Sequence, residues 1–271
     1  MNNILELIKK IAIDIEKNIF NNYEDRKPEK VYEICTDIVK KHSLKISDIK
    51  SIVSKDKKEI EILNNDGKYI LTYVSIDNVT LLDMNFSLGT IFTIYKDSIE
   101  SKNIIISSYV TYGPTFQIVF ATKENGIEFY SYDEKEFKQT ESFKLNNKGK
   151  INSMGGDVTN FLPKHKELMQ NFFNDGYRLR FSDSLALDTH QILFKKGGIY
   201  SQPKTATNKD GKLDLVFEAY PISFIVKLAG GEAIDDSKNN ILDIVYDGDI
   251  SKKTPIYFGS ANEIEKVKTF L

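Results

Sequence analysis

Few residues in this 271-residue chain have the types and spacing that chemistry usually requires. The three histidines, His42, His165 and His190, lack the spacing of metal ligands. We expect His190 to be a hydrogen-bonded core residue, and His42 and His165, in lysine-rich surroundings, to face solvent. The single cysteine, Cys35, excludes an internal disulfide and a cysteine-based zinc cluster, and it lies in an apolar helical stripe. The sequence contains no phosphate-binding glycine loop, dinucleotide fingerprint or nucleophile elbow.

The pattern of predicted helices and strands, which must position any site, changes near residue 150. Helices are predicted over 1–22 and from Pro28 onward, where isoleucine and valine recur at helical spacing. Strands are predicted next, at 59–63, 68–74, 89–95, 103–110, 116–121 and 127–132. The turn sequence Asn-Asn-Asp-Gly at 64–67 predicts a hairpin between the first two strands.

The second half alternates helices with extended segments. Helices are predicted at 162–174, 184–196 and 221–228, with a capping box at 260–263 that opens a last helix. Extended segments are predicted at 177–181, 213–217 and 255–258. This alternation predicts a mixed α/β (α+β) layered fold with two domains, 1–150 and 151–271.

Composition excludes several classes of protein. Lysine and arginine total 37 against 39 acidic residues, and the net charge of -2 offers no general attraction to nucleic acid or to an anionic membrane. Apolar runs are far shorter than the ~20 residues that span a bilayer. The amino terminus lacks the order of a signal peptide. We therefore expect a cytoplasmic protein that binds neither nucleic acid nor membrane.

Motifs along most of the chain occur in an order known from one family. They include Asn-Phe-Ser-Leu-Gly-Thr-Ile-Phe at 85–92, Ser-Leu-Ala-Leu-Asp-Thr-His at 184–190, the segment 211–221 that ends in Phe-Glu-Ala-Tyr-Pro, and Pro-Ile-Tyr-Phe-Gly-Ser at 255–260. Together they resemble the class 1 fructose-1,6-bisphosphatases of the magnesium-dependent sugar-phosphatase superfamily. The resemblance implies a layered α-β-α-β-α fold and the hydrolysis of a sugar phosphate in gluconeogenesis.

The resemblance also implies where metal ligands belong. Hard divalent ions that activate water need oxygen ligands, mostly carboxylates. The carboxylates that match the family's ligand positions are Asp56, Asp77 and Glu218. Two aspartates that orient the water in the family correspond to Asp25 and Val31.

Other family positions are altered. Lysine replaces a ligand glutamate, valine replaces a ligand aspartate, and an Asn-Val pair replaces a phosphate-cradling Gly-Ser pair, at Lys55, Val74, Asn78 and Val79. The exchange of a carboxylate for an ammonium changes the local charge by two units, and valine offers no lone pair. We therefore expect no bound cofactor, and Mg²⁺ only if the protein is an active phosphatase.

The resemblance places phosphate-binding cations at Arg180 and Lys212. Phenol and amide donors of the family's sugar-phosphate pocket are replaced by Phe181, Gln202 and a Gly-Gly-Asp-Val run at 155–158. In the family, the arginine that corresponds to Arg180 reaches a neighbouring subunit. The resemblance thus implies a homo-oligomer, or a hetero-oligomer with an active relative, and binding of phosphate or a sugar phosphate.

Three hypotheses about function follow. The first is a family member that has lost two-metal phosphatase activity, in which the Lys55 ammonium pairs with Asp77 and Glu218 in place of the metal. The second is an active sugar bisphosphatase with an atypical ligand set of Asp25, Asp56, Asp77 and Glu218. The third is an anion-binding module that uses Arg180 and Lys212.

Overall fold

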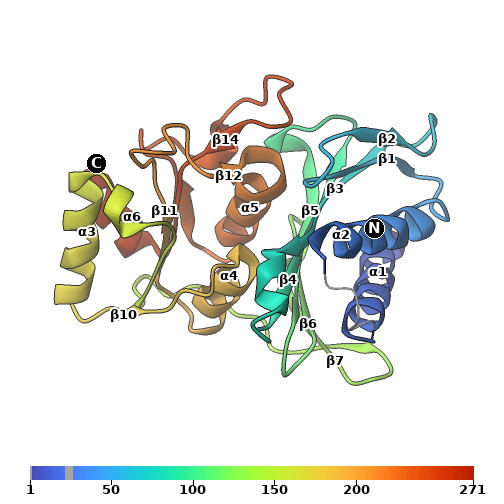
Figure 1. Ribbon diagram of the computed structural model, residues 1–271, viewed down its shortest axis with the longest axis horizontal. Helices are drawn as coiled ribbons and strands as arrows, with labels where there is room; N and C mark the ends of the chain where they lie inside the picture. The colour runs from blue at the N-terminus through green and yellow to red at the C-terminus, as the bar shows by residue number, and fades with distance from the viewer. Residues whose placement is uncertain (1, 22–26) are drawn as a thin grey trace.

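A computed structural model describes residues 2–21 and 27–271 of the chain (Figure 1). The two helices expected first are α1 (Asn2–Asn21) and α2 (Pro28–Ser43). Their apolar stripes face the core, and Cys35 is fully buried there. His42 is also buried, contrary to expectation, because it faces α1 and its Nε2 lies 2.7 Å from Asp14 Oδ2.

The strands of the first half form one eight-stranded sheet in the order β2-β1-β3-β4-β5-β6-β7-β8. Neighbours are antiparallel except for the parallel pair β1–β3. The strands are β1 (Ile49–Ser54), β2 (Ile60–Ile62), β3 (Tyr69–Asp77), β4 (Leu88–Lys96), β5 (Ile104–Tyr112), β6 (Gln117–Thr122), β7 (Gly126–Tyr132) and β8 (Phe137–Gln139).

The hairpin predicted across residues 64–67 is wrong. Strand β1, which the sequence patterns did not identify, lies between β2 and β3 and pairs with both of them. The turn therefore connects two strands that are not neighbours. A Cβ at Gly67 would lie 2.5 Å from the backbone nitrogen of Lys50, so this close approach to β1 requires glycine.

The second half forms a five-stranded sheet in the order β10-β9-β11-β15-β13. Its strands are β9 (Ile151–Met154), β10 (Arg178–Leu179), β11 (Ile199–Gln202), β13 (Glu232–Ile234) and β15 (Ile256–Gly259); a separate pair is β12 (Leu213–Asp214) with β14 (Lys253–Thr254). The helices are α3 (Pro163–Asn174), α4 (Leu185–Phe194), α5 (Tyr220–Leu228) and α6 (Ala261–Phe270). Short helical turns are η1 (Val79–Leu82), η2 (Ser101–Asn103), η3 (Val158–Asn160), η4 (Leu215–Ala219) and η5 (Ile241–Asp243).

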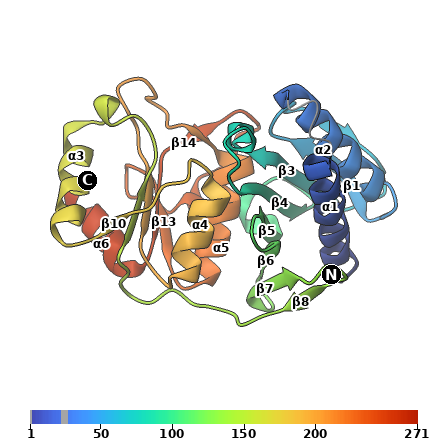
Figure 2. The same cartoon turned by 60° about the horizontal axis from the view of Figure 1, so that its bottom comes forward.

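Helices and sheets alternate in layers. Helices α1 and α2 cover one face of the large sheet, α4 and α5 lie between the two sheets, and α3 and α6 cover the outer face of the small sheet (Figures 1 and 2). The predicted layered α-β-α-β-α fold is therefore confirmed. None of the helices in the described part of the chain combines the length and apolar character that crossing a bilayer needs.

Three local expectations of the second half are corrected. Residues 213–217 form a strand only at 213–214, because the π-helical turn η4 follows directly and leads into α5. His165 is buried against Phe161 and Tyr257 instead of facing solvent. The capping box is not formed, because Glu263 is buried and accepts hydrogen bonds from the Gly149 backbone N–H and the Tyr177 hydroxyl.

Candidate functional site

A polar cavity of about 280 Å³ opens where β1 and β3 end, facing η4 and the start of α4. It gathers most of the residues singled out from the sequence, although they come from distant parts of the chain. Its lining includes Lys55, Asp56, Val74, Asp77, Asn78, Lys212 and Glu218. The cavity therefore corresponds to the expected site.

An ion pair between Lys55 and Glu218 dominates the cavity. Lys55 Nζ lies 2.6 Å from Glu218 Oε1, and the two side chains are 30% and 4% exposed. Burial disfavours the ammonium, but the charges of Glu218 and Asp77 outweigh that effect, so the pKa of Lys55 is raised. Lys55 thus stays charged and places a positive charge next to Glu218 in the cavity.

Asp77 is held by the start of α4 rather than by direct contact with Lys55. Its Oδ2 accepts hydrogen bonds of 2.8 Å from Ser184 Oγ and from the Ala186 backbone N–H. Burial is the largest cause that raises the pKa of Asp77, followed by the charge of Glu218, while Lys55 acts in the opposite direction. Lys55 therefore acts on Asp77 through its charge and forms no hydrogen bond with it.

Asp56 points to the same cavity from the residue after Lys55. Its Oδ2 accepts a 2.6 Å hydrogen bond from Ser75 Oγ. Burial raises the pKa of Asp56, and the Ser75 hydrogen bond and Lys55 partly offset that rise. Asp56 is thus bound to a protein hydroxyl rather than directed with Asp77 and Glu218 at a common point.

A second group of charged residues, centred on Asp214, contacts Glu218 and was not predicted from the sequence. The Asp214 backbone N–H donates a 2.7 Å hydrogen bond to Glu218 Oε2. The buried Asp214 carboxylate pairs with Lys58 Nζ at 2.8 Å and with Lys253 Nζ at 2.9 Å. No sequence feature marks these residues as partners, because 156 positions separate Lys58 from Asp214.

At the expected ligand positions, oxygen atoms are either engaged by other protein groups or missing. Both Glu218 oxygens accept hydrogen bonds, one of them from an ammonium, and Val74 is buried in the apolar core without a lone pair. Among residues 2–21 and 27–271, no three histidine, cysteine, aspartate or glutamate side chains are disposed to hold a metal ion. Asp25, a member of the alternative ligand set, lies outside the described residues.

The altered phosphate cradle has a structural role. Asn78, at a φ of 61°, donates through Nδ2 to the Asp183 backbone oxygen at 3.0 Å and to Asp183 Oδ2 at 2.8 Å. Val79 is buried in the core beside α1 and α2. The Asn-Val pair thus ties the end of β3 to the segment before α4 and buries a valine instead of presenting a Gly-Ser loop.

The two expected phosphate-binding cations are separated. Lys212 lines the cavity with Lys55, whereas Arg180 lines a different cleft at the edge of the small sheet. Phe181 and Gln202 also line the cavity.

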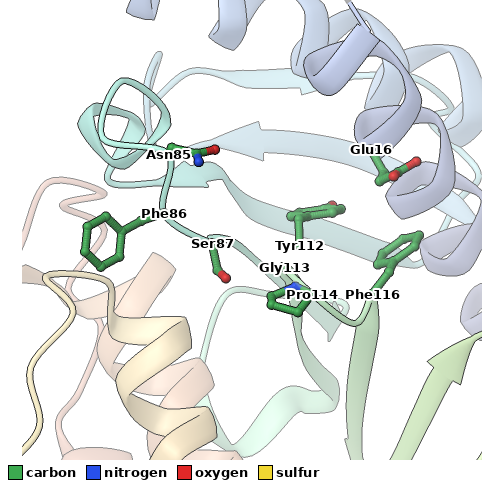
Figure 3. A pocket seen from close by; sticks show the side chains of 8 residues that line it. All are labelled: Glu16, Asn85, Phe86, Ser87, Tyr112, Gly113, Pro114 and Phe116. Atoms are coloured by element: carbon green, nitrogen blue, oxygen red, sulfur yellow. The ribbon is translucent and has the colours of Figure 1, made fainter.

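A further hollow of about 310 Å³ lies between α1 and the loops that follow η1 and β5 (Figure 3). Glu16 is the only carboxylate or cationic side chain among its described lining residues, and the Phe86, Tyr112 and Phe116 rings line much of the rest. Those groups form no acid–base pair or metal-ligand set, so this hollow is not the candidate site.

The sequence pattern described as "Fructose-1-6-bisphosphatase, N-terminal domain" matches residues 16–142, and "Fructose-1-6-bisphosphatase, C-terminal domain" matches residues 145–271. The chain belongs to the fructose-1,6-bisphosphatase family. It is 35% identical to "Fructose-1,6-bisphosphatase class 1" of Campylobacter hominis over 98% of both chains, and 36% identical to that of Campylobacter jejuni (strain RM1221) over 87% of this chain and 84% of the relative. It is also similar to the holo crystal structure of Leishmania major fructose-1,6-bisphosphatase, with 25% identity, a TM-score of 0.91, and 99% and 93% of the two chains covered.

Proposed function

We propose that this fructose-1,6-bisphosphatase family protein has lost two-metal phosphatase activity, and that Lys55 replaces the metal charge. The observation that carries the proposal is the 2.6 Å ion pair between Lys55 Nζ and Glu218 Oε1 inside the cavity. The raised pKa of Lys55 supports it, because the ammonium persists at neutral pH.

The magnitude of the charge reversal also supports loss of activity. Two unit charges about 4 Å apart interact by about 4 kcal/mol at an effective dielectric of 20. A dication beside the Lys55 ammonium would therefore be disfavoured by roughly 8 kcal/mol at most. Rotation of Lys55 away from the site would relieve this repulsion, but it would break the ion pair with Glu218. Val74 supplies no compensating ligand.

Binding without turnover is the role we assign to the cavity. Lys212 lines it without an ion pair to any described carboxylate, so its ammonium is available to a phosphate group. We propose a cytoplasmic protein that binds phosphate or a sugar phosphate and regulates or accompanies an active relative, as a homo-oligomer or a hetero-oligomer. Domains 1–150 and 151–271 would each contribute one wall of the cavity.

The test is release of phosphate from fructose 1,6-bisphosphate with Mg²⁺ or Mn²⁺. We expect the purified protein and its Asp77→Asn variant to give the same background rate. Turnover above background that disappears in Asp77→Asn would refute the proposal. Lys212→Gln serves a separate measurement, in which titration calorimetry with fructose 1,6-bisphosphate should show weaker binding than the unaltered protein.

The second candidate function is an active sugar bisphosphatase with an atypical site. The observation that favours it is the set of relatives named "Fructose-1,6-bisphosphatase class 1", one of them 35% identical over nearly the whole chain. Asp56, Asp77 and Glu218 would then be the carboxylates of the site. This function requires that Lys55 leave Glu218, so a Lys55→Ala variant should be more active than the unaltered protein.

A further inference from the structure

The hollow between α1 and the loops that follow η1 and β5 combines an acidic side chain with aromatic rings, and the proposed function does not use it (Figure 3). Its volume of about 310 Å³ lies at the lower end of the roughly 300–1,000 Å³ of small-molecule pockets. Among the residues that the structure describes, none lines both this hollow and the Lys55–Glu218 cavity. What the hollow could bind therefore depends on its own chemistry.

The Glu16 carboxylate forms no ion pair or hydrogen bond in the described part of the chain, unlike the other acidic side chains of α1. Glu6 pairs with Lys9 at 2.9 Å, and Asp14 Oδ2 lies 2.7 Å from His42 Nε2. Glu16 is half-buried, and no lysine, arginine or histidine is among the described residues that line the hollow. Such a carboxylate favours the approach of a cation.

Aromatic rings form the wall beside Glu16. Tyr112 and Phe116 stack with their ring centroids 5.3 Å apart, and Phe116 also contacts the rings of Tyr132 and Phe137 at centroid distances of 5.2 Å and 4.9 Å. Burial is the main cause that raises the pKa of Tyr112, and the negative charge of Glu16 adds to it, so the phenol stays neutral beside the carboxylate. Neutral rings held in this way attract a cation through their π systems.

The chain itself places an ammonium between an acid and a ring elsewhere on α1. Lys9 Nζ lies 2.9 Å from Glu6 Oε1 and 4.5 Å from the centroid of the Tyr130 ring. Glu16 and the neighbouring rings repeat two of these three parts, but the described lining includes no basic side chain that could supply the third. The hollow thus offers an external cation the same two kinds of partner that Lys9 has.

Polar side chains on the opposite side of the hollow supply further acceptors. Asn85 and Ser87 line it from the loop after η1 (Figure 3), and within the described residues neither side chain forms a hydrogen bond. A Cβ at Gly113 would lie 2.4 Å from Ser87 Oγ, so glycine allows this hydroxyl to lie against the loop between β5 and β6. Carboxylate, amide and hydroxyl oxygens together match the three N–H donors of a primary ammonium group.

We propose that this hollow binds a small protonated primary amine with an apolar body, whose ammonium group lies between Glu16 and the rings of Tyr112 and Phe116. Asn85 and Ser87 accept the N–H groups that Glu16 leaves free, and the rings contact the apolar body. The ligand is opposite in charge to a phosphate. The proposal therefore does not depend on what the polar cavity binds or on whether the protein has phosphatase activity.

The test is titration calorimetry with benzylamine at neutral pH, with benzyl alcohol as an uncharged ligand of similar shape. We expect saturable binding of one equivalent of benzylamine and much weaker binding of benzyl alcohol. Glu16→Gln should weaken benzylamine binding about tenfold, because it removes a hydrogen bond to a charged group, and Phe116→Leu should weaken it about threefold. The control Glu29→Gln removes the same charge from an exposed position of α2 and should leave binding unchanged. Thermal melting establishes that each variant is folded.

Absence of saturable binding would overturn the proposal, as would equal affinity for benzyl alcohol, which would show only an apolar crevice. Weakening in Asp183→Asn with retention in Glu16→Gln would place the amine in the polar cavity instead, since Asp183 lines that cavity. An affinity that falls as the protein concentration rises would show that a second copy of the chain covers the hollow, and would refute a ligand site.

Discussion

Removal of the Lys55 ammonium should lower the free energy of unfolding, because the buried Glu218 carboxylate loses its counter-charge. In Lys55→Met the aliphatic packing is largely kept, but Glu218, whose side chain is 4% exposed, loses its counter-charge. Breaking a buried ion pair by removing one partner costs about 3–5 kcal/mol. Lys55 is 30% exposed, so water screens part of the interaction, and we expect a loss of about 2–3 kcal/mol in the free energy of unfolding.

The assay is urea denaturation of the unaltered protein, Lys55→Met and Lys55→Met/Glu218→Gln at neutral pH. The double variant should recover most of the loss, because glutamine carries no buried charge and can still accept from the Asp214 backbone N–H.

Lys58→Met is a matched control within the same network. Lys58 pairs with the buried Asp214, but Asp214 keeps Lys253 at 2.9 Å when Lys58 is removed. We therefore expect Lys58→Met to cost less than about 1 kcal/mol. Equal losses in Lys55→Met and Lys58→Met, or an unchanged stability of Lys55→Met, would refute the counter-charge reasoning.

Three further variants test other parts of the account. Burial raises the pKa of Asp188 to about 7, so the folded protein keeps the Asp188 proton at low pH and loses it as the pH rises toward 7. Relative to Asp188→Asn, the free energy of unfolding of the unaltered protein should therefore fall by roughly 2–4 kcal/mol between about pH 4 and 7, as measured by urea titration. A difference between the two proteins that stays constant with pH would contradict this prediction. Gly149→Ala should lower stability by about 3 kcal/mol, because the new Cβ meets the Gly197 backbone; an unchanged melting temperature would show that the loops can separate. Ser184→Ala removes a hydrogen bond to the buried Asp77 and the side-chain cap of α4, so chemical denaturation should show a loss of about 2 kcal/mol, and a loss below about 0.5 kcal/mol would count against that anchoring.

Local periodicity predicted most helices and strands, but it did not predict which strands pair with each other. Helices α1 and α2 were identified because apolar residues recur along one face of each. The hairpin at 64–67 failed because β1 inserts between β2 and β3, which is a non-local event that the turn sequence does not encode. His165 was misassigned because neighbours on a helix point in different directions, so the flanking lysines do not report the burial of the histidine.

The contents of the site were predicted from resemblance rather than from local pattern. Lys55 and Glu218 are 163 positions apart, and only their match to family ligand positions suggested that they meet. Asp214 lies in the motif at 211–221, but its pairing with Lys58 and Lys253 was missed because the three residues are far apart in the sequence. Arg180, which follows β10, lines a separate cleft, whereas Lys212 lines the cavity that contains Lys55.

The most direct test of the central claim is a Mn²⁺ titration followed by electron paramagnetic resonance, with and without fructose 1,6-bisphosphate. We predict that the free Mn²⁺ signal keeps its full intensity up to millimolar protein, because Lys55 holds the charge that the ions would supply. Two bound equivalents of Mn²⁺ per chain, lost in Asp77→Asn, would contradict the account.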